Sequence, residues 1–164
     1  MIQTMDRVNK IIKNSDYQKY LNELRKNEKN RKFCRHNLSH FLDVARIASI
    51  INLKTNAQID DEHIYAAALL HDIGRAKAET CGASHAVTSA KLSEKILRDC
   101  CFSELEINYI LDAIIKHSDK NLNNVKNLSG ILYIADKLSR PCYVCDVKES
   151  CFWNLEKKNL KLKI

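Results

Sequence analysis

Glycine and proline are scarce in this chain of 164 residues, which contains three glycines and one proline. A protein of many short strands and tight turns needs more of both residues, so the composition favours helices. No stretch approaches the roughly 18 apolar residues that a membrane span requires. The N-terminus also lacks the apolar core of a secretory signal. We therefore expect a cytoplasmic protein without a membrane partner.

Cysteine, by contrast, is frequent, with seven residues. An odd count in a mid-sized chain without a signal favours reduced thiols or a metal site over disulfides. The hydrophobic content of 45% and the charged content of 29% suit one globular domain with a single core.

The net charge of +7 is unevenly distributed. Residues 1–35 carry 10 Lys and Arg against 4 Asp and Glu, whereas residues 36–140 carry 12 against 13. The basic start is interpreted as a solvated helix face, or as a surface for phosphates or acidic partners. Nucleic acid is not an expected partner, because the chain contains no zinc-finger spacing and no aromatic platform.

Apolar spacing predicts an all-α fold, a single-domain bundle of about six to seven helices. Asp60 and the Ser103–Glu106 capping box are predicted helix starts, and Gly74 is a predicted helix end. The expected helices cover residues 4–29 with a break near Asn14-Ser15, 39–52, 60–74, 84–98, 103–117, 128 to before Pro141, and 148–158.

Polar side chains continue the buried stripe of four of these helices: His40, His71, His117 and Asp136. A carboxylate or imidazole in a core costs several kcal/mol unless it is paired or bound to a metal. One such residue is usually a hydrogen-bonded core residue, but four on separate helices indicate a site assembled inside a bundle.

Two nitrogen and two carboxylate ligands, from His40, His71, Asp72 and Asp136, suit one divalent ion. Asp72 is also the predicted catalytic residue, because it is placed to bridge to a second ion held by His85 and His117. One or two ions are expected, and Fe, Mn, Co and Zn all remain open. Metal-bound hydroxide would then attack phosphorus near neutral pH.

Four cations near these residues, Arg75, Lys77, Lys116 and Lys137, are candidates for binding the phosphate of a small phosphorylated substrate. Each is equally well explained as a solvated side chain. His36 is interpreted as a surface or capping residue, with a position behind the metal site or facing the substrate as the alternatives.

The segment Ala66-Ala67-Ala68-Leu69-Leu70-His71-Asp72-Ile73-Gly74 resembles the HD-domain phosphohydrolase superfamily. The resemblance extends to His40-Phe41-Leu42-Asp43-Val44-Ala45 and to Ala135-Asp136-Lys137. It implies an HD-type helical core at 36–140 and hydrolysis of a phosphoester or phosphoanhydride in a nucleotide-like substrate. His85 and His117 resemble the extra ligands of dinuclear members, with a layout similar to the bacterial HD hydrolases that split diadenosine tetraphosphate.

The flanks are predicted to be a basic helical segment at 1–35 and a cysteine-containing segment at 141–164 that packs on the core. Cys142, Cys145 and Cys151, with Cys34 as a fourth ligand, are candidates for a structural zinc site. Buried or unpaired thiols are the main alternative, and an iron–sulfur or redox role is a further one.

A function from another class is also open, namely a non-catalytic, metal-stabilised module that senses a ligand or binds a partner. The basic start and the cysteine-rich end favour this alternative. No oligomeric state is predicted.

Overall fold

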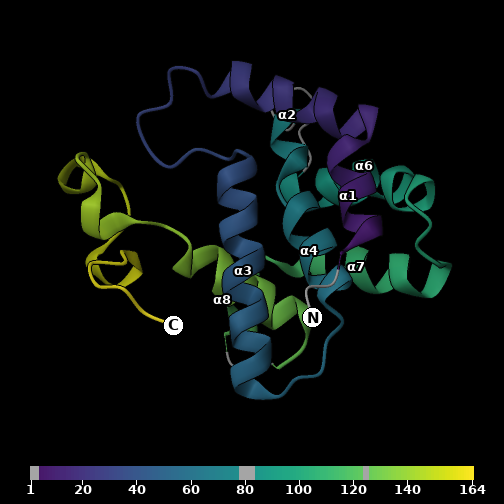
Figure 1. Ribbon diagram of the computed structural model, residues 1–164. Helices are drawn as coiled ribbons and strands as arrows, with labels where there is room; N and C mark the ends of the chain where they lie inside the picture. Colours follow the sequence, from purple (N-terminus) through teal and green to yellow (C-terminus); the bar gives the residue numbers. More distant parts are fainter. Residues whose placement is uncertain (1–3, 78–83, 124–125) are drawn as a thin grey trace.

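The computed structural model describes residues 4–77, 84–123 and 126–164. Within these ranges the chain forms seven α-helices and no strand (Figure 1), which confirms the predicted all-α fold. The helices are α1 (Asp6–Lys13), α2 (Ser15–Asn27), α3 (Leu38–Thr55), α4 (Asp61–Leu70), α6 (His85–Asp99), α7 (Glu104–Lys116) and α8 (Leu128–Leu138).

Side-chain caps define several helix starts. The Asn14 side chain accepts hydrogen bonds from the backbone N–H groups of Asp16 and Tyr17, at 2.9 and 3.1 Å. This cap begins α2 and confirms the predicted break. Asp60 caps α4, and Ser103 forms the predicted capping box at the start of α7. Such caps satisfy N–H groups that a helix start leaves without partners.

The centre of the bundle is α4, which packs against α1, α3, α7 and α8. Ile64 and the run from Ala66 to Leu70 are fully buried, so this helix is apolar on nearly all sides. Burying a Leu, Ile or Phe side chain stabilises the fold by about 1.5–3 kcal/mol. Phe41 of α3 and Ile110 of α7 add to the same core. The residues directly after α4 therefore lie deep in the interior.

The turn after α4 is a short 3-10 helix, η1 (Ile73–Ala76), and the prediction that the preceding helix reaches Gly74 was wrong. Gly74 is needed for close packing instead. A Cβ at this position would lie 2.4 Å from the carbonyl oxygen of His85 and 2.4 Å from the backbone nitrogen of Ser89. The Gly74 N–H also donates to Ser89 Oγ at 2.8 Å. Gly74 thus holds η1 against α6.

The predicted helix at 148–158 is wrong, because the C-terminal segment contains only the 3-10 turns η3 (Cys142–Val144), η4 (Lys148–Ser150) and η5 (Leu155–Lys157). Their backbone bonds join residues three apart, as from the Lys157 N–H to the Asn154 carbonyl at 3.2 Å. The Asn154 side chain accepts from the same N–H at 3.2 Å. Asn154 therefore starts a new turn instead of continuing a helix.

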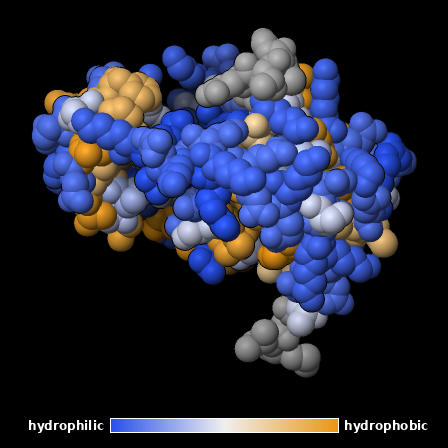
Figure 2. Space-filling model, turned by 90° about the horizontal axis from the view of Figure 1, so that it is seen from above, coloured by the Kyte–Doolittle hydropathy of each residue, from blue (hydrophilic) through white to orange (hydrophobic). Residues whose placement is uncertain are grey.

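This segment lies beside the bundle, in yellow at the left of Figure 1. The buried Asn159 side chain donates to the carbonyl oxygens of Lys137 and Arg140, at 2.6 and 3.0 Å, which anchors it to the end of α8. The segment exposes Phe152 and Leu155. Figure 2 shows a largely hydrophilic face with orange patches at its left side. No helix in the described part of the chain has the length and apolar character to cross a membrane.

Candidate metal centre

Four polar side chains meet in the core of the bundle, and we call them the first ligand set: His40 on α3, His71 and Asp72 after α4, and Asp136 on α8. One ligand atom of each lies within 4.8 Å of the others. His40 Nε2 is 3.5 Å from Asp136 Oδ1, and His71 Nε2 is 3.5 Å from Asp72 Oδ2. The structure thus brings together the four residues predicted to bind a first ion.

Three atoms that face one another in the first ligand set are buried and have no hydrogen-bond partner, namely Nε2 of His40 and His71 and Oδ1 of Asp136. Asp72 adds its Oδ2 atom, which lies 3.5 Å from His71 Nε2. Leaving one buried polar atom without a partner costs about 1–3 kcal/mol. A divalent cation would satisfy these three atoms and bind Asp72 Oδ2 as well. Imidazole nitrogen and carboxylate oxygen suit Zn, Mn, Fe or Co, so the donor set fits such an ion.

Backbone carbonyls orient two of the imidazoles. The Nδ1–H of His71 donates to the Ala68 carbonyl at 2.7 Å, and the Nδ1–H of His117 donates to the Ile114 carbonyl at 2.7 Å. Each histidine directly follows a helix, where the last carbonyls have no helical partner. These bonds leave the Nε2 lone pairs facing the site, as in metal-binding histidines.

A second ligand set consists of Asp72, His85 and His117, with ligand atoms again within 4.8 Å of one another. Asp72 Oδ1 lies 3.4 Å from His85 Nε2 and 3.5 Å from His117 Nε2. The other oxygen, Oδ2, faces His71 of the first ligand set. The Asp72 carboxylate therefore lies between the two sets, in the position of a bridging ligand.

The guanidinium of Arg75 contacts the second ligand set. Its Nε is 2.8 Å from Asp72 Oδ1, and a terminal nitrogen is 3.2 Å from His85 Nε2. Burial, together with a smaller effect of the Arg75 charge, lowers the pKa of His85 to about 4 despite the opposing charge of Asp72. His85 is therefore neutral near pH 7 and accepts the hydrogen bond. A second ion would have to share Asp72 and His85 with this cation.

Both aspartates are ionised near neutral pH. Burial alone would raise the pKa of Asp72, but the neighbouring His71, His117 and Arg75 hold it well below its usual range. Burial also acts to raise the pKa of Asp136, but the neighbouring His40, His71 and Lys137 outweigh it and hold the pKa well below its usual range. The ionised form is the one that binds a cation.

His36 and Glu28 support the site from behind, so the interpretation of His36 as a surface or capping residue was wrong. His36 is buried, and its Nδ1–H and backbone N–H donate to the two carboxylate oxygens of Glu28, both at 2.6 Å. Its Nε2 lies 3.4 Å from Asp72 Oδ2. In the sequence, the spacing of four residues between His36 and His40 was the signal that pointed to this position. Because His36 precedes α3, that spacing does not place the two side chains on one helix face.

The four predicted phosphate-binding cations lie in different surroundings. Lys137 pairs with the Asp136 carboxylate at 2.6 Å, and Arg75 contacts Asp72, so both lie at the ligand sets. Lys116 pairs with an aspartate one turn earlier on α7, at 2.7 Å. The Lys77 ammonium lies 5.6 Å from the centre of an aromatic ring on α2.

The four cysteines predicted to bind zinc line one cavity, but they do not form a metal site. Among the described residues, only the two histidine–aspartate sets bring three or more ligand atoms within 4.8 Å of one another. Cys34, Cys142, Cys145 and Cys151 are free thiols. The arrangement does not support the predicted structural zinc.

These observations define a class: an all-helical protein with a buried histidine–aspartate centre suited to divalent ions. The sequence pattern of the HD domain matches residues 37–140, more than half of the chain. The chain belongs to the HD domain family, as the sequence resemblance predicted.

Two similar proteins extend this comparison. An uncharacterized protein of Clostridium beijerinckii is 45% identical over 158 residues, which cover 96% of this chain and 99% of that protein. The crystal structure of a predicted HD superfamily hydrolase from an uncultured Thermotogales bacterium matches with a TM-score of 0.59 and 25% identity. This match covers 87% of our chain and 81% of the other. The family and the neighbour together support a metal-dependent hydrolase.

Proposed function

We propose that the chain is a metal-dependent phosphohydrolase that cleaves a phosphoester or phosphoanhydride bond of a nucleotide-like substrate. The observation that carries this proposal is the convergence of four ligand side chains in the first ligand set, three of which present a buried atom without a hydrogen-bond partner. Membership of the HD domain family and the hydrolase neighbour support the same reaction class.

In this proposal His40, His71, Asp72 and Asp136 would hold one divalent ion, and Asp72, His85 and His117 would hold a second. The position of Asp72 between the two sets supports its role as the bridge. When bound, such ions polarise the phosphoryl oxygens and lower the pKa of water near neutrality.

The residues around the ligand sets would prepare the substrate. Arg75 and Lys137 each pair with a site aspartate while keeping part of the side chain exposed, at 28% and 36%. They are therefore placed to bind phosphate oxygens and to stabilise negative charge as the bond to the leaving oxygen breaks. The buried His36–Glu28 pair keeps Asp72 in position, since it contacts the Oδ2 atom directly.

Hydrolysis of a panel of nucleotides and aryl phosphoesters, with and without added Mn²⁺, tests this function. We expect metal-dependent release of phosphate or nucleotide, and its loss in Asp72→Asn with helical circular dichroism unchanged. Asp112→Asn is a matched control, because Asp112 is an exposed aspartate that pairs with Lys116 on α7. It should retain full activity.

Undiminished hydrolysis in Asp72→Asn would contradict the proposal. Inactivity of the metal-loaded protein across the whole panel would instead favour the non-catalytic, ligand-sensing module.

A further inference from the structure

A cavity of about 360 Å³ opens beside the first ligand set. One wall is formed by the loop before α3 and the start of that helix, and the other by the end of α8 and the C-terminal segment. His40 belongs both to the first ligand set and to the cavity lining. A phosphate held at the first ligand set would therefore extend its remaining groups into this cavity, whose size lies within the range of ligand sites.

Positive charge dominates the lining, which contains five cations and a single carboxylate, Asp43. The cations are Lys32, Arg35, Arg140, Lys148 and Lys158. Arg35 and Lys158 donate to backbone carbonyls, at 3.2 and 2.7 Å, and not to a carboxylate. Their charges are thus available to an anion.

Arg140 connects the cavity to the metal centre. It is 9% exposed, and its buried Nε has no hydrogen-bond partner. A terminal nitrogen is 3.5 Å from Asp136 Oδ1, and the guanidinium lies 4.4 Å from the centre of the Trp153 ring. A buried N–H without an acceptor is unfavourable, and an anionic group in the cavity would relieve it.

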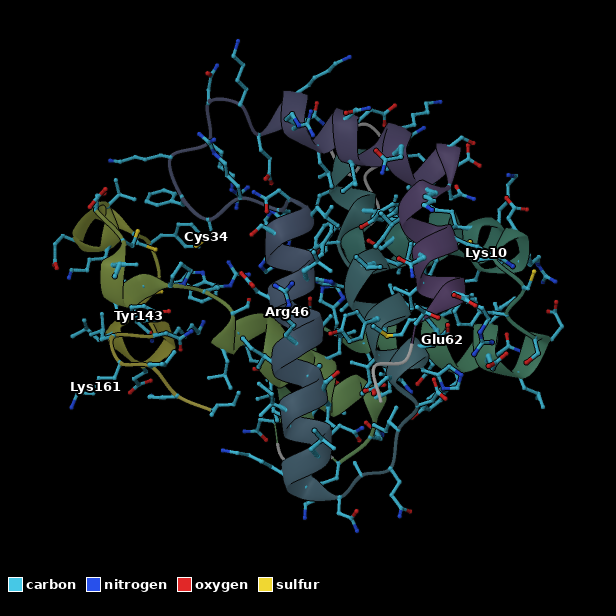
Figure 3. All side chains as sticks on the ribbon, in the orientation of Figure 1. Lys10, Cys34, Arg46, Glu62, Tyr143 and Lys161 are labelled. Carbon is cyan, nitrogen blue, oxygen red and sulfur yellow. The ribbon has the colours of Figure 1, made fainter. Side chains whose placement is uncertain are left out.

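Apolar side chains and thiols form another part of the lining. Phe33 and Val144 contribute side chains from opposite walls, together with the four free thiols. Phe33 also packs edge-to-face on Phe152, with ring centroids 5.6 Å apart. Figure 3 shows Cys34 on the loop before α3 and Tyr143 on the C-terminal segment, the two parts of the chain that enclose the cavity. Apolar walls with a few cations suit a ligand that joins a flat organic group to phosphate.

We propose that this cavity binds the part of the substrate that does not react, a nucleoside phosphate, with its phosphate against Arg140 and the lysines of both walls. This inference rests on the proposed function, because it assigns the position of that substrate beyond the cleaved bond. Much of one wall comes from residues after 140, outside the stretch that matches the HD domain. The cavity is therefore built largely from the part of the chain that the family does not define.

Trp153 is the only tryptophan of the chain and reports on the cavity through its contact with Arg140. We would titrate the full chain with ADP, with adenosine and inorganic phosphate as comparisons, and follow tryptophan fluorescence. We expect saturable quenching by ADP in the wild type and in Asp72→Asn. Adenosine and phosphate should each bind at least about tenfold more weakly, because each lacks half of the recognised groups.

Charge reversal on each wall makes this test specific. Lys148→Glu and Arg35→Glu should each weaken ADP binding about tenfold, since each replaces an attraction by a repulsion. Lys161→Glu is the matched control, because it makes the same charge change on an exposed residue of the C-terminal segment outside the cavity lining (Figure 3). It should change the affinity less than twofold.

Equal ADP affinity in all three charge variants, or the absence of any fluorescence response to saturating ADP, would overturn the proposal. Hydrolysis of bis(p-nitrophenyl) phosphate, measured on the same preparations, separates this failure from that of the proposed function. If hydrolysis requires Asp72 but ADP binding does not respond to the two wall variants, the proposal for the cavity alone is rejected. If the wall variants weaken ADP binding but no hydrolysis occurs, the cavity proposal stands and the proposed hydrolase function is rejected.

Discussion

The two ligand sets share Asp72 but differ in how far the protein already satisfies them. In the first set, ligand atoms of His40, His71 and Asp136 are buried and have no hydrogen-bond partner. In the second, His85 is 25% exposed along its side chain and interacts with Arg75. An ion gains more free energy where it satisfies buried lone pairs than where it must displace a guanidinium. We therefore expect the first set to bind its ion more tightly.

The supporting contacts differ in the same way. The first set lies on α3, the end of α4 and α8, which pack directly on one another. The second set depends on the close contact at Gly74, which positions α6 and its first residue, His85. A second ion should consequently be sensitive to changes that leave the first ion in place.

Replacing a first-set ligand should have the largest effect. We expect His71→Ala to lose the first ion and to lower hydrolysis at least about 100-fold, because loss of residues that merely support a metal ligand already costs about 10–100-fold. Elemental analysis and steady-state kinetics measure both quantities. His63→Ala is the control, since His63 bonds to Glu106 away from both sets. A variant that kept its metal and rate would refute the assignment of the first set.

The Gly74→Ala substitution should have the second-largest effect. The added Cβ would overlap the backbone of α6, so we expect the free energy of unfolding to fall by about 1–3 kcal/mol. We also expect loss of the second ion with retention of the first. Chemical denaturation measures the free energy of unfolding, and metal titration measures the number of bound ions. Unchanged stability would show that α6 does not depend on this contact.

His85→Ala should lower hydrolysis about tenfold and reduce the bound metal toward one ion, because only a half-buried ligand of the second set is lost. Isothermal titration with Mn²⁺ provides the stoichiometry. Equal loss of both ions would remove the proposed difference between the sets.

Arg75→Gln should change metal affinity the least. It should increase the affinity, whereas the other substitutions decrease it. Removing the guanidinium beside Asp72 should strengthen the second ion by about two- to fivefold, the size expected for one partly exposed charge interaction. KM for the substrate should rise in the same variant if Arg75 binds phosphate. Weaker binding of the second ion would mean that Arg75 organises the set instead of competing with the ion.

Much of the fold was predictable because its causes are local in sequence. The caps at Asn14, Asp60 and Ser103 involve neighbouring residues, and apolar spacing along each helix indicates which side faces the core. The same spacing turns His40 and Asp136 inward, so the first ligand set could be proposed before any coordinates. The prediction of a helix at 148–158 was wrong because Asn154 starts a new 3-10 turn. The composition of this segment does not distinguish such a turn from a continuing helix.

The chain of amino acids alone determined the helical character, the inward direction of His40, His71, His117 and Asp136, and the resemblance to the HD domain. Only the tertiary structure decided that His36 and Glu28 lie behind Asp72, that Arg75 contacts the second set, and that the cysteines line a cavity without forming a metal site. The reason is physical. A helix face follows from side chains three and four residues apart, whereas these contacts join segments whose meeting depends on how all the helices pack.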